Sequence, residues 1–228
     1  MTNQKTAILI FANSAQQEAV NKPFRKSSAI FDVLNKQTLQ KVKRSKLPYF
    51  LISEEEQKGE TFGERYTNAI QFVYDQGFEN VITVGNDTPQ LQTSQLIETA
   101  KKLEENPIIL GPSKDGGYYM MGLNKSQFNL ETFLNLPWQT SQLTKHISRL
   151  LSARKIKIVF LKMLTDIDNI SDAKSVLNDF RNISSALRKI LLSLFSSEKI
   201  IISYSPFFFQ NSSEEINYNK GSPLLLHI

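Results

Sequence analysis

Signals for strands and helices alternate along the first 180 residues, and this alternation limits the folds that the chain can adopt. Short apolar runs that suit buried strands are separated by longer segments whose apolar residues recur at helical spacing. The predicted strands are 6–12, 49–53, 81–84, 107–111, 118–123 and 157–162, and the predicted helices are 27–44, 62–77, 93–106, 140–153 and 171–180. The helix at 62–77 places Phe62, Tyr66, Ala69, Ile70 and Val73 on one face and has Gly77 as its stop, and Thr93 or Ser94 is the expected cap of the helix at 93–106. Strands that alternate with helices favour parallel pairing. We therefore expect an α/β fold with a layered, mostly parallel sheet and helices on both of its faces.

The character of the sequence changes near residue 181, which divides the chain into two expected parts. Residues 1–181 are expected to form the α/β domain, and residues 182–228 a C-terminal extension that packs on it. Within the extension, 184–195 indicates a helix and IIISY at 200–204 indicates a strand. The triple phenylalanine at 207–209 favours core or interface packing over a ligand site.

Composition excludes several classes of function. The chain has no cysteine and two histidines, which excludes disulfides, thiolate catalysis and Cys-based zinc and disfavours a histidine-rich metal site. The N-terminal apolar run is too short for a signal peptide, and no run approaches the roughly 18 apolar residues that a membrane helix needs. We therefore expect a soluble, cytoplasmic protein.

The net charge of +5 raises the question of a nucleic-acid partner. Basic residues are scattered among acidic ones, and the densest basic run, KVKRSK at 41–46, falls at the predicted end of a helix, where cations suit the helix dipole. A solvated helix end is favoured there over a nucleic-acid surface.

The stretch VITVGNDTPQL at 81–91 starts as a buried strand and then stops at an aspartate. Open α/β sheets bind ligands beyond the carboxyl ends of their strands, which is where Asp87 is expected to lie. Asp87, Thr88 and Pro89 are also common turn formers, so a plain Asx turn is an alternative for this stretch taken alone.

A second carboxylate lies at a strand boundary in GPSKDGGYYMMG, residues 111–122. There Asp115 precedes Gly116 and Gly117, a pair that allows either close approach of the backbone to a ligand or a plain tight hairpin. The sequence alone leaves both interpretations open.

Two further carboxylates follow a predicted strand in TDIDNISDA, residues 165–173. Asp168 or Ser171 could merely cap the next helix. Several carboxylates delivered separately to strand ends, Asp166 among them, nevertheless favour a shared site. Oxygen ligands without His or Cys suit Mg²⁺ or Mn²⁺.

The order of these stretches resembles a known family. VGNDTPQL, GPSKDGGYYMMGL, LPWQTSQL and DIDNISDA follow one another, and GETFGERYTNAI precedes them. Over about residues 6–180 the chain resembles the small bacterial nucleotide-diphospho-sugar transferase-like proteins, often classed as arsenosugar-biosynthesis glycosyltransferases. Those proteins are distant relatives of the guanylyltransferases that act on molybdenum cofactor and on phospholactate. The resemblance implies a glycosyltransferase-A type fold.

The resemblance also implies roles for individual residues. Asp87 and Asp168 are expected to hold a divalent metal, Mg²⁺ or Mn²⁺, and Asp115 is the candidate catalytic base in the donor or acceptor pocket. The other predicted substrate-binding residues in the matched stretches are Arg65, Asn86, Thr88, Pro89, Gly116, Gly117, Tyr118, Trp138 and Asp166. Lys22, in the loop at 11–25 that departs from the family pattern, could also supply positive charge.

Together these residues predict metal-assisted transfer from a nucleotide-activated sugar. One alternative is nucleotidyl transfer to a small phosphorylated acceptor, in which the attack falls on the α-phosphate. Another is a nucleotide-binding protein without turnover, because the loop at 11–25, FANSAQQEAVNKPFR, lacks the glycine and the Lys-Thr-Arg-Leu motif usual in the family. No nucleic-acid partner and no membrane span are expected, and homo-oligomerisation is left open.

Overall fold

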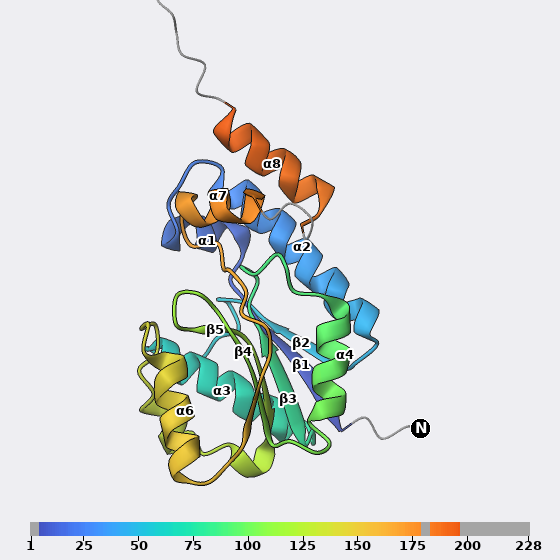
Figure 1. The fold of residues 1–228 in the computed structure, drawn as a ribbon, viewed down its shortest axis with the longest axis vertical. Coiled ribbons are helices and arrows are strands. Elements are labelled where there is room, and N and C mark those ends of the chain that lie inside the picture. Colours follow the sequence, from blue (N-terminus) through green and yellow to red (C-terminus); the bar gives the residue numbers. More distant parts are fainter. Residues whose placement is uncertain (1–4, 179–182, 197–228) are drawn as a thin grey trace, which may run out of the picture. The chain divides into compact units, whose positions relative to one another are not determined.

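The computed structural model describes residues 5–178 and 183–196, which form a six-stranded sheet flanked by helices (Figure 1). The strands are β1 (Thr6–Phe11), β2 (Tyr49–Ile52), β3 (Asn80–Val84), β4 (Ile108–Pro112), β5 (Tyr118–Asn124) and β6 (Ile158–Phe160). The helices are α1 (Ala15–Asn21), α2 (Ser27–Ser45), α3 (Phe62–Asp75), α4 (Thr93–Lys102), α5 (Leu130–Leu134), α6 (Leu143–Ala153), α7 (Ile170–Asn178) and α8 (Ser185–Phe195), and a 3-10 turn, η1 (Lys125–Gln127), follows β5.

The strand order across the sheet is β2-β1-β3-β5-β4-β6. β1 pairs in parallel with β2 and β3, and β4 pairs in parallel with β6. Of the six described strands, β5 alone runs antiparallel to its neighbours, β3 and β4. The other five strands therefore end at one edge of the sheet, and β5 starts there. The predicted mostly parallel α/β sheet is confirmed.

Successive side chains of β1 point to opposite faces of the sheet, as the geometry of a strand requires. Ala7 and Leu9 join a hydrophobic core shared with α3, α5 and α6, whereas Ile8 and Ile10 join a second core shared with α2 and α4. In Figure 1 the sheet lies between α3 and α6 on one side and α2 and α4 on the other. The prediction of helices on both faces is confirmed.

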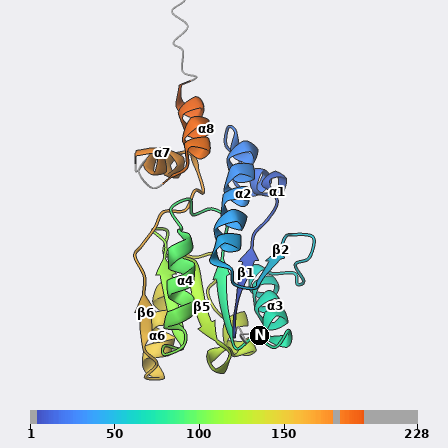
Figure 2. The same cartoon turned by 90° about the vertical axis from the view of Figure 1, so that its right-hand side faces the viewer.

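A third hydrophobic core joins α1, α2, α7 and α8, which Figure 2 shows at the same end of the sheet. α8 corresponds to the helix predicted at 184–195, and its Leu187 and Leu191 are fully buried against α2 and α7. α8 therefore packs on α2 and α7. The strand predicted at 200–204 and the triple phenylalanine at 207–209 lie outside the described residues.

Two local features differ from the sequence-based expectation. The segment between β1 and α2 contains helix α1 rather than an uninterrupted loop. α4 has Gln92 as its cap instead of Thr93 or Ser94, and the Gln92 amide donates to Gln95 Oε1 at 2.8 Å. By contrast, Gly77 follows the end of α3 as predicted, with a φ of 91° that suits glycine.

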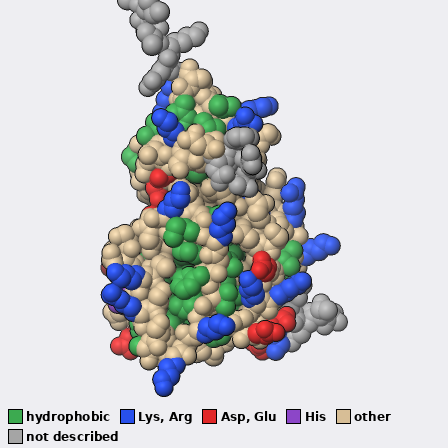
Figure 3. Space-filling model, viewed as in Figure 1, with side chains coloured by type: hydrophobic (Ala, Val, Ile, Leu, Met, Phe, Trp, Pro, Cys, Tyr) green, Lys and Arg blue, Asp and Glu red, His purple; other side chains and the backbone are tan. Residues whose placement is uncertain are grey.

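Lys and Arg side chains are spread over the face shown in Figure 3, around a strip of hydrophobic side chains. On this face, the positive charge is therefore not gathered into one basic patch. Among the described helices, none has both the length and the apolar character needed to cross a membrane.

Candidate functional site

A cavity of about 970 Å³ opens where the five parallel strands end, and we call it the strand-end cavity. Its walls come from the segments after β1, β2, β3 and β6, from the β4–β5 hairpin, from α1 and α3, and from residues 138–143. Open α/β sheets bind their ligands at this edge, and the volume falls in the range of small-molecule sites.

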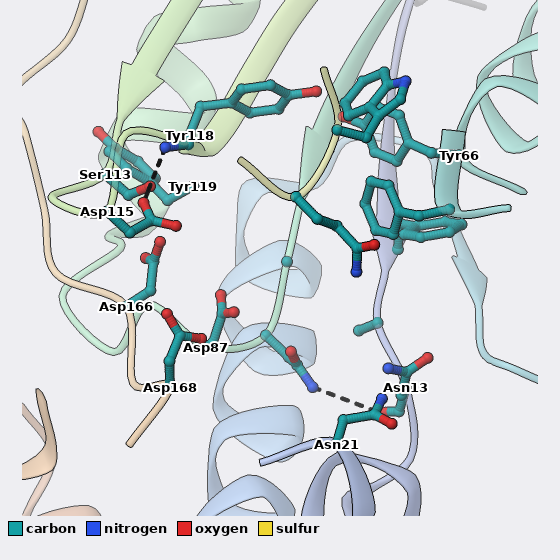
Figure 4. Close-up of a pocket in the computed structure, with 18 of the residues that line it drawn as sticks. Asn13, Asn21, Tyr66, Asp87, Ser113, Asp115, Tyr118, Tyr119, Asp166 and Asp168 are labelled. Carbon is teal, nitrogen blue, oxygen red and sulfur yellow. Dashed lines mark hydrogen bonds between the residues drawn. The ribbon is translucent and has the colours of Figure 1, made fainter. Parts of the chain in front are cut away.

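Four aspartates gather along one wall of the strand-end cavity (Figure 4). Asp87 follows β3, Asp115 lies in the β4–β5 hairpin, and Asp166 and Asp168 follow β6. The segments after β3 and β6 are joined directly, because the Ile167 amide donates to the Asp87 carbonyl at 2.9 Å. The fold therefore brings together carboxylates that the sequence placed at three separate strand ends.

Two of these carboxylates, Asp166 and Asp168, have raised pKa values. Burial raises the pKa of Asp166, and the neighbouring charge of Asp87 raises it further, against the hydrogen bond that the Thr88 hydroxyl donates. Burial also raises the pKa of Asp168, although the ammonium of Lys22 opposes the rise. Crowded, partly desolvated carboxylates in a cavity are typical of functional sites.

The Lys22 ammonium lies between two of the carboxylates. Its Nζ is 2.8 Å from Asp87 Oδ2, 2.8 Å from Asp168 Oδ1 and 3.8 Å from Glu18 Oε2. Burial would lower the pKa of Lys22, but the charges of Asp87, Glu18 and Asp168 outweigh it and raise that pKa well above its usual value. The centroid of the Phe31 ring lies 5.1 Å from Nζ. Lys22 is therefore a charged counterion held inside the carboxylate cluster.

Helix α1 delivers Lys22 to this position because both of its ends are fixed. Ser14 Oγ accepts a hydrogen bond from the Gln17 amide at 3.2 Å, and the Ser14 amide donates to Glu54 Oε2 at 2.6 Å. Lys22 itself is the C-cap residue, and its amide donates to the Glu18 carbonyl at 2.7 Å. The Ser-x-x-Gln spacing is a capping-box pattern, so the sequence carried a start signal for this helix.

A network of asparagines joins α1, α2 and the segment after β3. The Asn86 side chain donates to Asn35 Oδ1 at 2.7 Å and to the Asn13 carbonyl at 3.3 Å, and the Asn13 side chain donates to Glu18 Oε1 at 3.1 Å. Asn86 is buried, so these bonds satisfy its amide. They also fix the backbone that carries Asp87.

The β4–β5 hairpin is held against the start of α6. Gly116 has a φ of 94°, and a Cβ there would lie 2.1 Å from the Ser141 carbonyl oxygen. The Thr144 amide donates to the Gly116 carbonyl at 3.1 Å, and the Thr144 hydroxyl donates to the Gly117 carbonyl at 2.6 Å. The glycine pair therefore makes a tight hairpin and also permits close backbone approach, in this case to the protein's own chain.

A second wall of the strand-end cavity is aromatic, and we call Phe11, Phe62, Tyr66, Tyr118 and Trp138 the aromatic wall. The Trp138 ring centroid lies 5.0 Å from that of Tyr66, and Nε1 of the indole donates to the Phe133 carbonyl at 2.7 Å. Gly63 of α3 leaves room for the indole, because a Cβ there would lie 2.6 Å from Trp138 Cδ1. Tyr66 lies across the cavity from Asp166 in Figure 4.

Most of the site residues predicted from the sequence line the strand-end cavity: Lys22, Arg65, Asn86, Asp87, Asp115, Gly117, Tyr118, Trp138, Asp166 and Asp168. Thr88, Pro89 and Gly116 are not part of its lining. Thr88 supports Asp166 through its hydroxyl, and the Pro89 carbonyl accepts a hydrogen bond from Lys41 Nζ at 2.8 Å. These residues hold the walls of the cavity.

Sequence reasoning missed several residues of the lining. Asn13 and Glu18 lie in the segment that was expected to be a loop, and Glu54 follows a short strand without a recognisable motif. Tyr66 was expected only as a core-facing residue of a helix. The capping pattern of α1 could have indicated that Glu18 and Lys22 share one helical face, since they are four residues apart.

The chemistry of the carboxylate cluster suits a hard divalent cation. Mg²⁺ commonly takes one or two carboxylates and completes its coordination with substrate phosphates and water. Asp87 and Asp168 fit that role. Among residues 5–178 and 183–196, no group of three or more His, Cys, Asp or Glu side chains is arranged to hold a metal ion.

Comparisons with known proteins agree with this architecture. A family model described as "Uncharacterized protein conserved in bacteria (DUF2064)" matches residues 33–140. A crystal structure from Desulfovibrio desulfuricans G20, of a protein proposed to be a nucleotide-diphospho-sugar transferase, is 20% identical, with a TM-score of 0.72 over 85% of this chain and 94% of that one. The chain has the nucleotide-diphospho-sugar transferase fold. The resemblance inferred from the sequence motifs is confirmed.

More distant structures match with TM-scores below 0.5. They include 4-diphosphocytidyl-2C-methyl-D-erythritol synthase from Anaerococcus prevotii DSM 20548, at 14% identity and a TM-score of 0.48 over 85% of this chain and 95% of that one. Rv0371C with manganese, from Mycobacterium tuberculosis H37Rv, is 12% identical, with a TM-score of 0.44 over 76% of this chain and 98% of that one. At these scores neither carries an argument about activity. No curated protein sequence matches the chain.

The family match and the carboxylate cluster overlap only in part. Arg65, Asp87 and Asp115 fall within the matched residues 33–140, whereas Lys22 and Asp168 fall outside them. The transferase fold is thus established by the structural likeness, and the activity has to be argued from the chemistry of the strand-end cavity.

Proposed function

We propose that the protein is a transferase that uses a nucleotide-activated sugar together with Mg²⁺ or Mn²⁺. The observation that carries this proposal is the convergence of Asp87, Asp115 and Asp168, from three strand ends, in one cavity at the ligand-binding edge of the sheet. The likeness to the Desulfovibrio desulfuricans protein supports the class of donor.

Asp87 and Asp168 are the proposed metal ligands, and the ion, when bound, would neutralise the diphosphate and stabilise the charge that develops on the leaving group. Lys22 and Arg65 are the basic side chains that line the cavity, and in this proposal they add positive charge near the phosphates of the donor. Without the divalent ion, the crowded carboxylates would repel the negatively charged diphosphate. A donor without metal should therefore bind weakly.

Asp115 is the proposed base. Its Oδ1 accepts hydrogen bonds from the Ser113 hydroxyl at 2.5 Å and from the Gly117 amide at 3.0 Å, so the carboxylate is held in a fixed orientation on the cavity wall. It would take the proton of an acceptor hydroxyl while that oxygen attacks the anomeric carbon and the bond to the diphosphate breaks. The aromatic wall offers a flat apolar surface for a ring of the donor or acceptor.

Calorimetric titration of nucleotide-sugars, with and without Mn²⁺, tests this proposal. In Asp87→Asn and Asp168→Asn, metal-dependent affinity should fall about tenfold or more, because a hard cation needs the lost charge. Each substitution also removes an ion pair with Lys22, so urea unfolding of both variants is measured alongside to show that the affinities are those of folded protein. Asp32→Asn is the matched control, since Asp32 forms an exposed ion pair with Lys36 on α2. Unchanged metal-dependent affinity in both cavity variants would reject the metal site.

Product analysis distinguishes the reactions that this site could carry out. Release of a nucleoside diphosphate indicates glycosyl transfer, and release of pyrophosphate indicates nucleotidyl transfer. Binding without either product indicates a nucleotide-binding protein that does not turn over.

A further inference from the structure

The Lys22 ammonium fills the space between the two proposed metal ligands. Asp87 Oδ2 and Asp168 Oδ1 are each 2.8 Å from the same Nζ atom, which is hydrogen-bonding distance for a charged pair. Mg²⁺ binds carboxylate oxygens at about 2.0–2.1 Å. An ion that touched both oxygens would therefore need the volume that the ammonium occupies, so Lys22 and the ion exclude each other from this position.

We propose that Lys22 is a built-in competitor for the divalent cation: it occupies the position between Asp87 and Asp168 in the free protein and yields it when a metal–diphosphate complex binds. This inference rests on the proposed function for the identity of the metal ligands. The inference goes beyond the proposed function because it assigns Lys22 a role in controlling when the metal ion can bind.

The surroundings of Lys22 suit a side chain that exchanges partners. Glu18 lies one helical turn before it on α1, and Glu18 Oε2 is 3.8 Å from Nζ, so an ammonium displaced from the two aspartates keeps a carboxylate partner within reach. The side chain of Glu18 is almost fully buried (7% exposed), whereas that of Asp168 is 40% exposed. The pair with Glu18 is thus the more protected contact, and the pair with Asp168 is the more exposed one.

The charges of the cluster explain why the exchange needs the diphosphate. Lys22 supplies one positive charge to Asp87 and Asp168, and a divalent ion supplies two, but a free ion must first break two short ion pairs. A bound diphosphate adds ligand oxygens and further negative charge, both of which favour the divalent ion over the ammonium. The free protein should therefore bind Mn²⁺ weakly and gain affinity when a nucleoside diphosphate is present.

Titration of Mn²⁺ into nucleotide-free protein, followed by electron paramagnetic resonance of the free ion, tests the competition. Lys22→Met should bind Mn²⁺ about tenfold tighter than the wild type or more, since it frees two carboxylates from charged hydrogen bonds. Lys36→Met is the matched control, because Lys36 forms an exposed ion pair on α2, and it should bind Mn²⁺ as the wild type does. Lys22→Arg keeps the charge and should also bind Mn²⁺ weakly. A folded Lys22→Met protein that binds Mn²⁺ no tighter than the wild type would overturn the proposal.

A measurement on the unaltered protein covers the case in which Lys22→Met does not fold. The ¹⁵Nζ resonance of Lys22, which its ion pairs protect from exchange, should shift or broaden when Mg²⁺ and a nucleoside diphosphate are added together. An unchanged resonance at saturation would mean that the ammonium stays in place, and the proposal would be wrong.

The two proposals fail in different ways. If Lys22→Met binds Mn²⁺ tightly but no nucleotide-sugar binds in a metal-dependent manner, the competition stands and the proposed function fails. If metal-dependent nucleotide binding is lost in Asp87→Asn, yet Lys22→Met gains no affinity for Mn²⁺, the proposed function stands and the competition fails.

Discussion

Replacing Gly63 with alanine should displace the Trp138 indole from the aromatic wall. The added Cβ would lie 2.6 Å from Cδ1 and 2.9 Å from Nε1 of the indole, whereas carbon atoms in contact normally stand about 3.5–4.0 Å apart. The indole must therefore move, and its 2.7 Å hydrogen bond to the Phe133 carbonyl is expected to break.

Three terms set the size of the effect on the free energy of unfolding. Overpacking of a well-packed site costs about 1–3 kcal/mol, and loss of the indole hydrogen bond costs about 1 kcal/mol. Alanine is favoured over glycine inside a helix by about 1 kcal/mol, which acts in the opposite direction. We expect Gly63→Ala to destabilise the protein by about 1–3 kcal/mol, the sum of these terms.

Urea unfolding of a double-mutant cycle measures this directly. In the Trp138→Ala background the clash is absent, so Gly63→Ala should be neutral or stabilising by up to about 1 kcal/mol. Trp138 is the single tryptophan of the chain, so a red shift of its emission in Gly63→Ala would report the displaced indole. The reasoning is wrong if Gly63→Ala destabilises both backgrounds equally, or if neither stability nor emission changes in the parent protein.

Two further predictions concern α8 and a buried lysine. Leu191→Ala should destabilise the protein by about 2–5 kcal/mol in urea unfolding, because Leu191 is fully buried. The control Leu192→Ala, at a 47% exposed position, should leave the free energy of unfolding within about 0.5 kcal/mol of the parent value. Equal effects of the two substitutions would show that α8 does not pack as described. Burial lowers the pKa of Lys41 from 10.5 to about 8, so between these values the unfolded chain binds more protons than the folded one and stability should rise with pH. Lys41→Met should abolish that rise, which is measured as the difference between the unfolding free energies at about pH 7.5 and about pH 10, values that bracket most of the pKa interval. If the stability of the parent protein rises no more than that of the variant, the lowered pKa of Lys41 is contradicted.

The strands and the carboxylates at their ends could be predicted from the sequence because each has a local cause. The run at 81–84 before Asp87 is apolar except for Thr83 and is buried throughout, as expected of a strand covered on both faces, and Gly85 and Asn86 mark its end. Asp168 also follows a strand that an apolar run predicted, β6, although the residues of β6 are only partly buried or exposed. Local pattern and fold agree at these positions.

The partnership of Lys22 with Asp87 could not be predicted in this way. The two residues are 65 positions apart, and they meet because β3 pairs directly with β1, an arrangement that no local pattern encodes. Helix α1 was missed because Ala15 and Glu18 are its only buried residues, so no apolar stripe marks it. Its position depends on capping and on the contact between Ser14 and Glu54.

Tyr66 shows a different limit of sequence reasoning. Helical spacing correctly placed it on the inward face of α3, and it is buried. It also lines the strand-end cavity. Periodicity identifies which face of a helix points inward, but it does not distinguish a solid core from the wall of a cavity.

Because all described strands except β5 run in one direction, the connections of the domain divide into two separate groups. The connections that wall the cavity are 12–14, 53–61, 85–92, 113–117, 135–142 and 161–169, and those at the opposite edge are 46–48, 76–79, 103–107 and 154–157. The second group carries none of the cavity lining. Loop closure becomes only slowly more costly as a connection lengthens. An affinity tag, a fluorescent reporter or new chain termini introduced at 103–107 should therefore leave ligand chemistry intact, whereas the same insertion at 113–117 would separate the glycine pair from α6.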